Sequence, residues 1–128
     1  LMLPRYSNIL PSNTNIKLKL TKNIILKVPF LSSAMDTVTE AKMAISMANE
    51  GGIGIIHRNL KIKSQTQEVK KVKKKKLIVG AAIGTNNEDL DRARSLIANG
   101  VDLIVIDTAH GHSAKVLKAL SQLKKNRQ

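Results

Sequence analysis

The chain has 128 residues, of which 42% are apolar and only 2% aromatic, and it carries a formal net charge of +13 at neutral pH. This length allows at most one ordinary domain, and the aliphatic residues are numerous enough to form its core. Cysteine is absent, which excludes a disulfide, a thiolate metal ligand and a cysteine nucleophile within these residues. No apolar stretch is long enough to span a bilayer, and the first residues lack a signal-peptide pattern, so we expect a cytoplasmic protein with no membrane partner.

The excess of positive charge raises the question of a nucleic-acid partner. Apart from a lysine-rich run at 70–76, the basic residues are scattered, and neither aromatic stacking residues nor a recognised binding motif accompanies them. We therefore expect no specific nucleic-acid binding. Weak, salt-sensitive binding to polyanions follows from the charge alone.

The first part of the chain predicts a loop and then a hairpin. Proline, serine and asparagine residues make 1–15 irregular. Residues 16–28 alternate between apolar and polar side chains on both sides of a turn at Asn23, which is typical of a short, half-buried β-hairpin. Pro29 closes the hairpin.

The rest of the chain predicts four β/α units in succession, because unbroken apolar runs alternate with apolar residues at helical spacing. Strands are expected at 30–35, 53–57, 77–82 and 101–108, and helices at 40–49, 64–75, 88–99 and 113–125. The last of these strands reads as covered on both faces, and the first reads as a buried strand. Thr37 or Thr39 is the expected N-cap of the first helix, the pair Gly51-Gly52 is its expected stop, and Gly100 is the expected stop of the third helix.

Short connections between the units predict neighbouring parallel strands with right-handed crossovers. The fold class is therefore α/β, either a small open sheet or half of a (β/α)8 barrel, that is, a hairpin plus four consecutive β/α units. An ordinary barrel needs about eight strands to close. The first and fourth strands would then be open edges that invite pairing.

Polar and small residues follow two of these strands. Asp107 ends the apolar run at 103–106. The strand at 30–35 runs into Ser32 and Ser33 and is followed by Asp36. Ligands of parallel α/β proteins gather at the carboxyl ends of strands, so both groups would face the same side of one sheet. From the spacing alone, Asp107 could equally be a solvated residue or a helix N-cap, and Ser33 and Met35 could simply be strand-end packing.

The histidines and two of the glycines predict structural roles. No cysteine and no helical histidine pair accompanies His57, His110 and His112, so no metal site is expected. Gly80 and Gly84 lack the spacing of a dinucleotide-binding fingerprint, and we expect them to allow tight turns.

Four motifs resemble, in order, the first four barrel strands of the inosine-5′-monophosphate (IMP) dehydrogenase family. They read LSSAMDTVTEA (31–41), GGIGIIHRN (51–59), VGAAIG (79–84) and IDTAHGHS (106–113). Guanosine monophosphate reductase is a close relative with the same fold, but the fourth motif looks more like that of the dehydrogenase. The resemblance covers nearly the whole chain.

The resemblance implies a (β/α)8 enzyme of guanine nucleotide synthesis that oxidises IMP to xanthosine monophosphate with NAD as cofactor. It implies that Ser33 and Met35 lie against the nucleotide substrate, through a hydroxyl donor and a thioether that packs on the purine. It implies that Asp107 accepts hydrogen bonds from the ribose hydroxyls on the nicotinamide side of NAD, with Thr108 and Ala109 lining the same pocket.

The chain departs from the family pattern in two places. The regulatory CBS modules that the family usually inserts are absent at about 73–77, where lysines run directly into Leu77. The fifth to eighth strands, the cysteine nucleophile and the monovalent-cation (K⁺) site are expected outside this chain. We therefore expect 1–128 to be one domain, the N-terminal half of the barrel, with no catalytic residue and no metal ligand of its own.

Two hypotheses follow. In the first, the chain is part of an IMP dehydrogenase, or of a reductase-like relative, that binds IMP and NAD but is inactive without the C-terminal half of the barrel. In the second, it is a degenerate, non-catalytic half barrel that serves binding or assembly, for example as a homo-oligomer.

Overall fold

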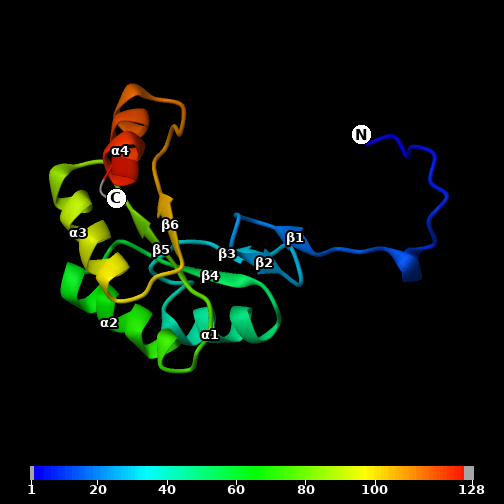
Figure 1. Ribbon diagram of the computed structural model, residues 1–128, viewed down its shortest axis with the longest axis horizontal. Helices are drawn as coiled ribbons and strands as arrows, with labels where there is room; N and C mark the ends of the chain where they lie inside the picture. The colour runs from blue at the N-terminus through cyan, green and yellow to red at the C-terminus, as the bar shows by residue number, and fades with distance from the viewer. Residues whose placement is uncertain (1, 126–128) are drawn as a thin grey trace.

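The computed structural model describes residues 2–125. A parallel sheet forms the centre of the body, helices cover one face of it, and the N-terminal segment extends away from the body (Figure 1). The elements in chain order are η1 (Pro11–Asn13), β1 (Leu18–Lys19), β2 (Ile25–Leu26), β3 (Leu31–Ser32), α1 (Ala41–Asn49), β4 (Ile53–Ile56), α2 (Ile62–Lys73), β5 (Gly80–Ile83), α3 (Asn87–Ala98), β6 (Leu103–Ile106) and α4 (Ala114–Lys125).

The strands pair in chain order, β3-β4-β5-β6, and every pair is parallel. This confirms the four predicted β/α units, and the arrangement is that of a partial (β/α)8 barrel. The sheet formed by the described residues is open, with β3 and β6 at its edges. The antiparallel pair β1-β2, in which Leu18 lies opposite Leu26, confirms the predicted hairpin.

Two aliphatic cores lie on the two faces of the sheet, because successive side chains of a strand point to opposite faces. In β5, Ala81 and Ile83 pack towards the helices, whereas Ala82 packs in the same core as Leu26 of the hairpin. The core on the helix side consists of Ala41, Ala44, Ile56, Val69, Val72, Val79, Ala81, Ile83, Ala93 and Leu96. The core on the hairpin side consists of Ile24, Leu26, Ile53, Ile55 and Ala82.

The two edge strands are less buried than the sequence predicts. Every residue of β4 and β5 is buried, but Leu31 of β3 is 44% exposed and the residues of β6 are only half-buried. An unbroken apolar run does not reveal whether a further strand lies beside it. The prediction that these two strands are buried is therefore wrong.

The helix stops are as predicted, but the N-cap of α1 is not. Gly51 and Gly100, which follow α1 and α3, have φ angles of +89° and +82°, the left-handed conformation that favours glycine. Thr39 is buried and does not cap α1. Its hydroxyl instead donates to the carbonyl oxygen of Ser33 at 2.6 Å, and Thr37 makes no capping hydrogen bond either.

The N-terminus of α1 is capped from another helix. The Ala41 N–H donates to the Glu68 carboxylate of α2 at 2.9 Å, and the Lys71 ammonium donates to the other oxygen of the same carboxylate. Partial burial raises the pKa of Glu68, but the hydrogen bonds from Lys71 and Ala41 outweigh it and hold this pKa below its ordinary value of 4.5. A tertiary contact thus replaces the local threonine cap.

Gly80 is the first residue of β5 and Gly84 directly follows this strand, and neither lies in a turn or has a positive φ. A Cβ atom at Gly80 would lie 2.5 Å from Cδ1 of Ile55, and one at Gly84 would lie 2.5 Å from Oδ2 of Asp89. Both glycines therefore allow close packing, and the predicted turn role is wrong.

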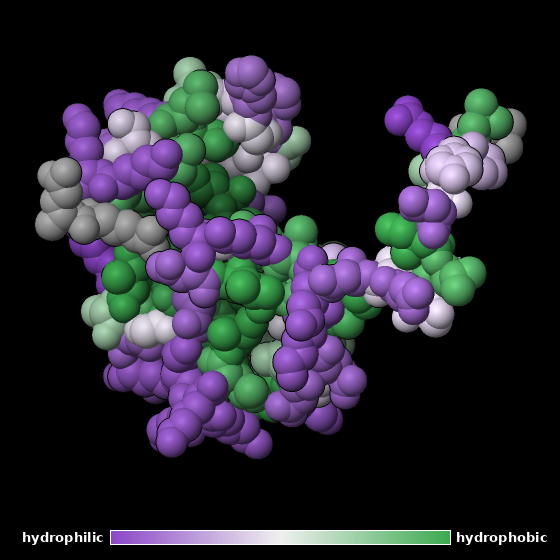
Figure 2. All heavy atoms as spheres, turned by 45° about the vertical axis from the view of Figure 1, so that its right-hand side comes forward, coloured by the Kyte–Doolittle hydropathy of each residue, from purple (hydrophilic) through white to green (hydrophobic). Residues whose placement is uncertain are grey.

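Hydrophobic side chains form a band across the middle of one face of the body, between hydrophilic ones (Figure 2). Among residues 2–125, no helix is both long and apolar enough to cross a membrane.

We predict that Gly54→Ala weakens the contact between α1 and β4. A Cβ atom at this position would lie 2.3 Å from Cα of Ala44, a backbone atom that cannot move without shifting the helix. The free energy of unfolding, measured by urea titration, should fall by about 1–3 kcal/mol, as for overpacked cores.

Gly111→Ala is the matched control, because nothing lies within 4 Å of its added Cβ atom. Its unfolding free energy should stay within about 0.5 kcal/mol of the unsubstituted chain. Equal effects of the two substitutions would contradict the packing of α1 on Gly54.

We predict a pH-dependent contribution from Glu68. Because its folded-state pKa is lowered, the carboxylate stabilises the fold above its ordinary pKa, and this contribution is lost as the pH falls through the lowered value. At neutral pH, Glu68→Gln should lower the unfolding free energy by about 0.5–1 kcal/mol, the usual size of a charge at a helix N-terminus.

Urea titrations of both proteins at a series of pH values measure this difference. It should shrink towards zero in acid. Glu50→Gln, at the C-terminal end of α1, the helix that Glu68 caps, is the control and should cause no loss at neutral pH. A difference that stays constant down to strongly acidic pH would disprove the assignment.

Candidate functional site

The loops that follow the four parallel strands meet at one end of the sheet. We call residues 33–40, 57–61, 84–86 and 107–113 the strand-end rim. Ser33 follows β3 and Asp107 follows β6, and since all the pairs are parallel, both lie at the same end of the sheet. Their strands are three spacings apart, on the order of 14 Å.

The loop between β4 and α2 connects the two sides of this rim. The Asn59 amide donates to Oδ2 of Asp36 at 3.0 Å, on the β3 side. On the β6 side, Nε of Arg58 lies 3.7 Å from Oδ2 of Asp107. Two consecutive residues thus contact acids that follow the two edge strands.

A buried glutamine of α2 holds the strand ends beneath this loop. The Gln65 side chain is fully buried, and its amide nitrogen lies within hydrogen-bond distance of three carbonyl oxygens. These belong to Ile56 at 3.3 Å, His57 at 2.9 Å and Ala82 at 2.8 Å. One side chain therefore ties the carboxyl end of β4 to β5.

Arg92 of α3 completes the network. Its Nη1 donates to Oε1 of Gln65 at 3.0 Å and to the carbonyl oxygen of Leu60 at 2.8 Å. Nε of Arg92 lies 3.7 Å from Oδ1 of Asp89, so the buried guanidinium has a counter-charge. The backbone on both sides of Arg58 and Asn59 is thus held by buried groups.

His57 lies below the rim and is 3% exposed. Its Nε2 lies 3.4 Å from Oε1 of Glu40, while its Nδ1 is buried and has no hydrogen-bond partner among the described residues. Within residues 2–125, no three histidine or acidic side chains are grouped closely enough to hold a metal ion.

The predicted site residues lie in two groups on the rim. Asp107 is half exposed, Ala109 is exposed, and the Thr108 hydroxyl is buried without a partner among residues 2–125. On the other edge strand, Ser33 is exposed and Met35 is 54% exposed. The fold brings both groups to one end of the sheet, with β4 and β5 between them.

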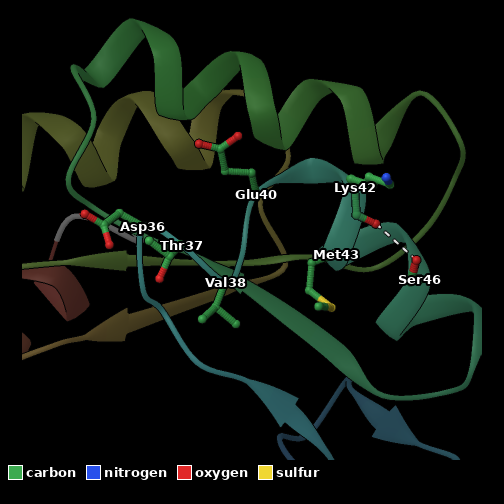
Figure 3. Close-up of a pocket in the computed structure, with 7 residues that line it drawn as sticks. All are labelled: Asp36, Thr37, Val38, Glu40, Lys42, Met43 and Ser46. Carbon is green, nitrogen blue, oxygen red and sulfur yellow. Dashed lines mark hydrogen bonds between the residues drawn. The ribbon is translucent and has the colours of Figure 1, made fainter.

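Two hollows in the surface do not contain these residues. One, of about 380 Å³, lies between the loop before α1 and the first turns of that helix (Figure 3). It is lined by Asp36, Thr37, Val38, Glu40, Lys42, Met43 and Ser46. The other, of about 430 Å³, lies beside β6 and is lined by the hairpin turn, the first residues of β6, and side chains of α3 and α4. Asp36, Thr37, Val38 and Glu40 of the strand-end rim line the first of these hollows, whereas Ser33, Met35 and residues 107–109 line neither.

Sequence reasoning missed the residues that organise the rim. Arg58 and Asn59 stand in the second motif, but the motif does not say which acids they contact. Gln65 did leave a signal, because it stands four and seven residues before Val69 and Val72, on the buried stripe of α2.

Four parallel strands that alternate with helices have the arrangement of a partial (β/α)8 barrel, a fold in which ligands bind at the carboxyl ends of the strands. The sequence profile described as the IMP dehydrogenase / GMP reductase domain matches residues 1–128. The chain belongs to the IMP dehydrogenase / GMP reductase family.

Three similar relatives, each named inosine-5′-monophosphate dehydrogenase, show how much of such a protein the chain spans. The Cryptosporidium parvum protein is 40% identical over 97% of this chain and 41% of its own length. The Borreliella burgdorferi protein is 36% identical over 96% of this chain and 43% of its own length. For the Aquifex aeolicus protein the identity is 29%, over 98% of this chain and 52% of the relative. The chain thus spans between two fifths and about half of these relatives.

We predict that Gln65→Leu destabilises the fold. The substitution removes the donor to the strand-end carbonyls and leaves the buried Arg92 without one of its acceptors. The unfolding free energy should fall by about 2–3 kcal/mol, the cost of unsatisfied buried polar groups.

Gln67→Leu, at an exposed position of the same helix, is the control and should change this energy by no more than about 0.5 kcal/mol. Urea titration measures both. A Gln65→Leu protein as stable as the control would show that the network contributes nothing.

Proposed function

We propose that this chain supplies part of the nucleotide-binding rim of an enzyme that oxidises IMP with NAD. The observation that carries the proposal is that Ser33 and Asp107 lie at the same end of one parallel sheet, in a chain of this family. Ligand sites of parallel α/β proteins form at that end.

On the NAD side, Asp107 is the proposed acceptor for the ribose hydroxyls of the cofactor. Its carboxylate is half exposed, and two adjacent hydroxyls suit two carboxylate oxygens. The buried, unpartnered Thr108 hydroxyl next to it, with Ala109 beyond, fits a polar ligand in the same place. NAD, when bound, supplies the hydride acceptor, and these residues hold its ribose.

On the IMP side, Ser33 and Met35 are the proposed substrate contacts. Both side chains are exposed at the end of β3, and the Thr39 hydroxyl holds the Ser33 carbonyl at 2.6 Å. A fixed backbone with free side chains supports a binding role, in which the hydroxyl donates to the nucleotide and the thioether packs on its base.

The reactive thiolate must come from outside these residues, because the chain has no cysteine. We propose that further strands of the barrel, including the one that bears this cysteine, pair with the open edges of β3 and β6. The half-buried β6 and the adjoining hollow, which is lined by Ile97, Ile104, Ile106, Leu120 and Leu123 among others, support this proposal. We also propose that α2 leads directly into β5 without an inserted regulatory module, since only residues 74–79 join them.

The test is complementation. We predict that this chain, co-expressed with the part of the Cryptosporidium parvum relative that it does not span, forms NADH from NAD and IMP, whereas neither part does so alone. Asp107→Asn should lower kcat/KM for NAD by at least about tenfold, the loss of hydrogen bonds to a charged acceptor.

Asp91→Asn, which removes an exposed carboxylate from α3, is the control and should leave kcat/KM for NAD unchanged. A stable complex of the two parts that forms no NADH would contradict the proposed function. Equal kinetics of the Asp107→Asn and unsubstituted complexes would contradict the role of Asp107.

A further inference from the structure

Arg58 lies on the strand-end rim, and hydrogen bonds from buried side chains hold the backbone on both sides of it. The carbonyl oxygen of His57, just before it, accepts a hydrogen bond from Gln65, and that of Leu60, two residues later, accepts one from Arg92. The next residue, Asn59, donates a hydrogen bond from its side-chain amide to Asp36. The Cα atom of Arg58 is therefore held by contacts on several sides.

The Arg58 side chain, by contrast, is held loosely. Its Nε lies 3.7 Å from Oδ2 of Asp107, whereas a charge-assisted hydrogen bond is about 2.7–2.9 Å long. The two side chains are 46% and 48% exposed, so water screens the pair and little free energy is needed to open it.

The pair has a consequence for ligand binding. While the guanidinium faces Asp107, it competes with ribose hydroxyls for the same carboxylate oxygen. Once displaced, it is an unpaired fork of N–H donors, which matches the geometry of a phosphate group. A ribose diol and a 5′-phosphate belong to one nucleotide, so a single ligand can satisfy both residues at once.

We propose that Arg58 is a specificity-determining residue. It screens Asp107 in the free chain and turns to the phosphate of a bound ribonucleotide when Asp107 takes up the ribose diol. The site thereby selects 5′-phosphorylated ribonucleosides over unphosphorylated ones. This inference rests on the proposed function, which assigns the diol to Asp107.

The test compares two probes that differ only in the phosphate, nicotinamide mononucleotide and nicotinamide riboside. Their affinities for the chain are measured at low salt by calorimetry or ligand-observed NMR. The unsubstituted chain should prefer the mononucleotide by at least about tenfold, the contribution of one charge-assisted hydrogen bond.

Arg58→Gln should abolish this preference, because it weakens binding of the mononucleotide and leaves the affinity for the riboside unchanged or higher. Arg58→Lys keeps the charge without the fork and should retain an intermediate preference. Arg94→Gln is the matched control, because it breaks a similarly exposed ion pair, with Asp91 on α3, and it should leave the preference unchanged. Thermal melts confirm that each variant is folded.

The outcomes separate the two claims. Asp107→Asn can weaken riboside binding while Arg58→Gln leaves the preference unchanged. In that case Arg58 forms only an ordinary surface ion pair, and the inference falls, but the proposed function stands. If Asp107→Asn leaves riboside binding unchanged, the proposed role of Asp107 falls and the inference falls with it. Failure of the folded chain to bind either probe overturns the inference, whereas the complementation assay still decides the proposed function.

Discussion

The parallel pairing of β3, β4, β5 and β6 is the constraint on which the rest of the structure depends. Every strand of such a sheet leaves in the same direction, so every following loop reaches the same end. Four short motifs spread from residue 31 to residue 113 thereby become one rim. The same pairing needs a crossover connection after each strand but the last, here α1, α2 and α3, and these helices bury one face of the sheet while the hairpin buries part of the other.

A buried polar network of Gln65 and Arg92 lies at the carboxyl ends of β4 and β5. Carbonyl oxygens at the ends of β4 and β5 lie where the sheet gives way to loops, and buried carbonyls without donors destabilise a fold. Gln65 supplies the donor, and Arg92 orients the glutamine by occupying its other end. The network stands directly beneath Arg58 and Asn59, so the groups that satisfy the core also hold the surface residues of the candidate site.

The few acidic residues of this chain, whose net charge is +13, make specific contacts. Almost every carboxylate has a nitrogen-bearing partner, such as Asp102, which accepts from Lys73 and from the Val79 N–H at the start of the sheet. On the strand-end rim, Asp36 accepts a hydrogen bond from Asn59, and Asp107 faces the Arg58 guanidinium. The surplus is carried mainly by lysines of the exposed surface, where water screens their mutual repulsion.

The amino-acid sequence by itself determined the order of the elements, the aliphatic cores, the glycine helix stops and the family, because these follow from local periodicity and from motifs that are contiguous in the chain. It also indicated that Ser33 and Asp107 share one end of the sheet, which follows from parallel topology alone. Only the tertiary structure decided the remaining features. It left the residues of β6 half-buried, replaced the predicted threonine cap of α1 with Glu68 of another helix, and joined Arg58 to Asp107 and Gln65 to Arg92. Each of these contacts joins residues from different elements, and its geometry depends on how helices and strands pack in three dimensions, which no local pattern encodes.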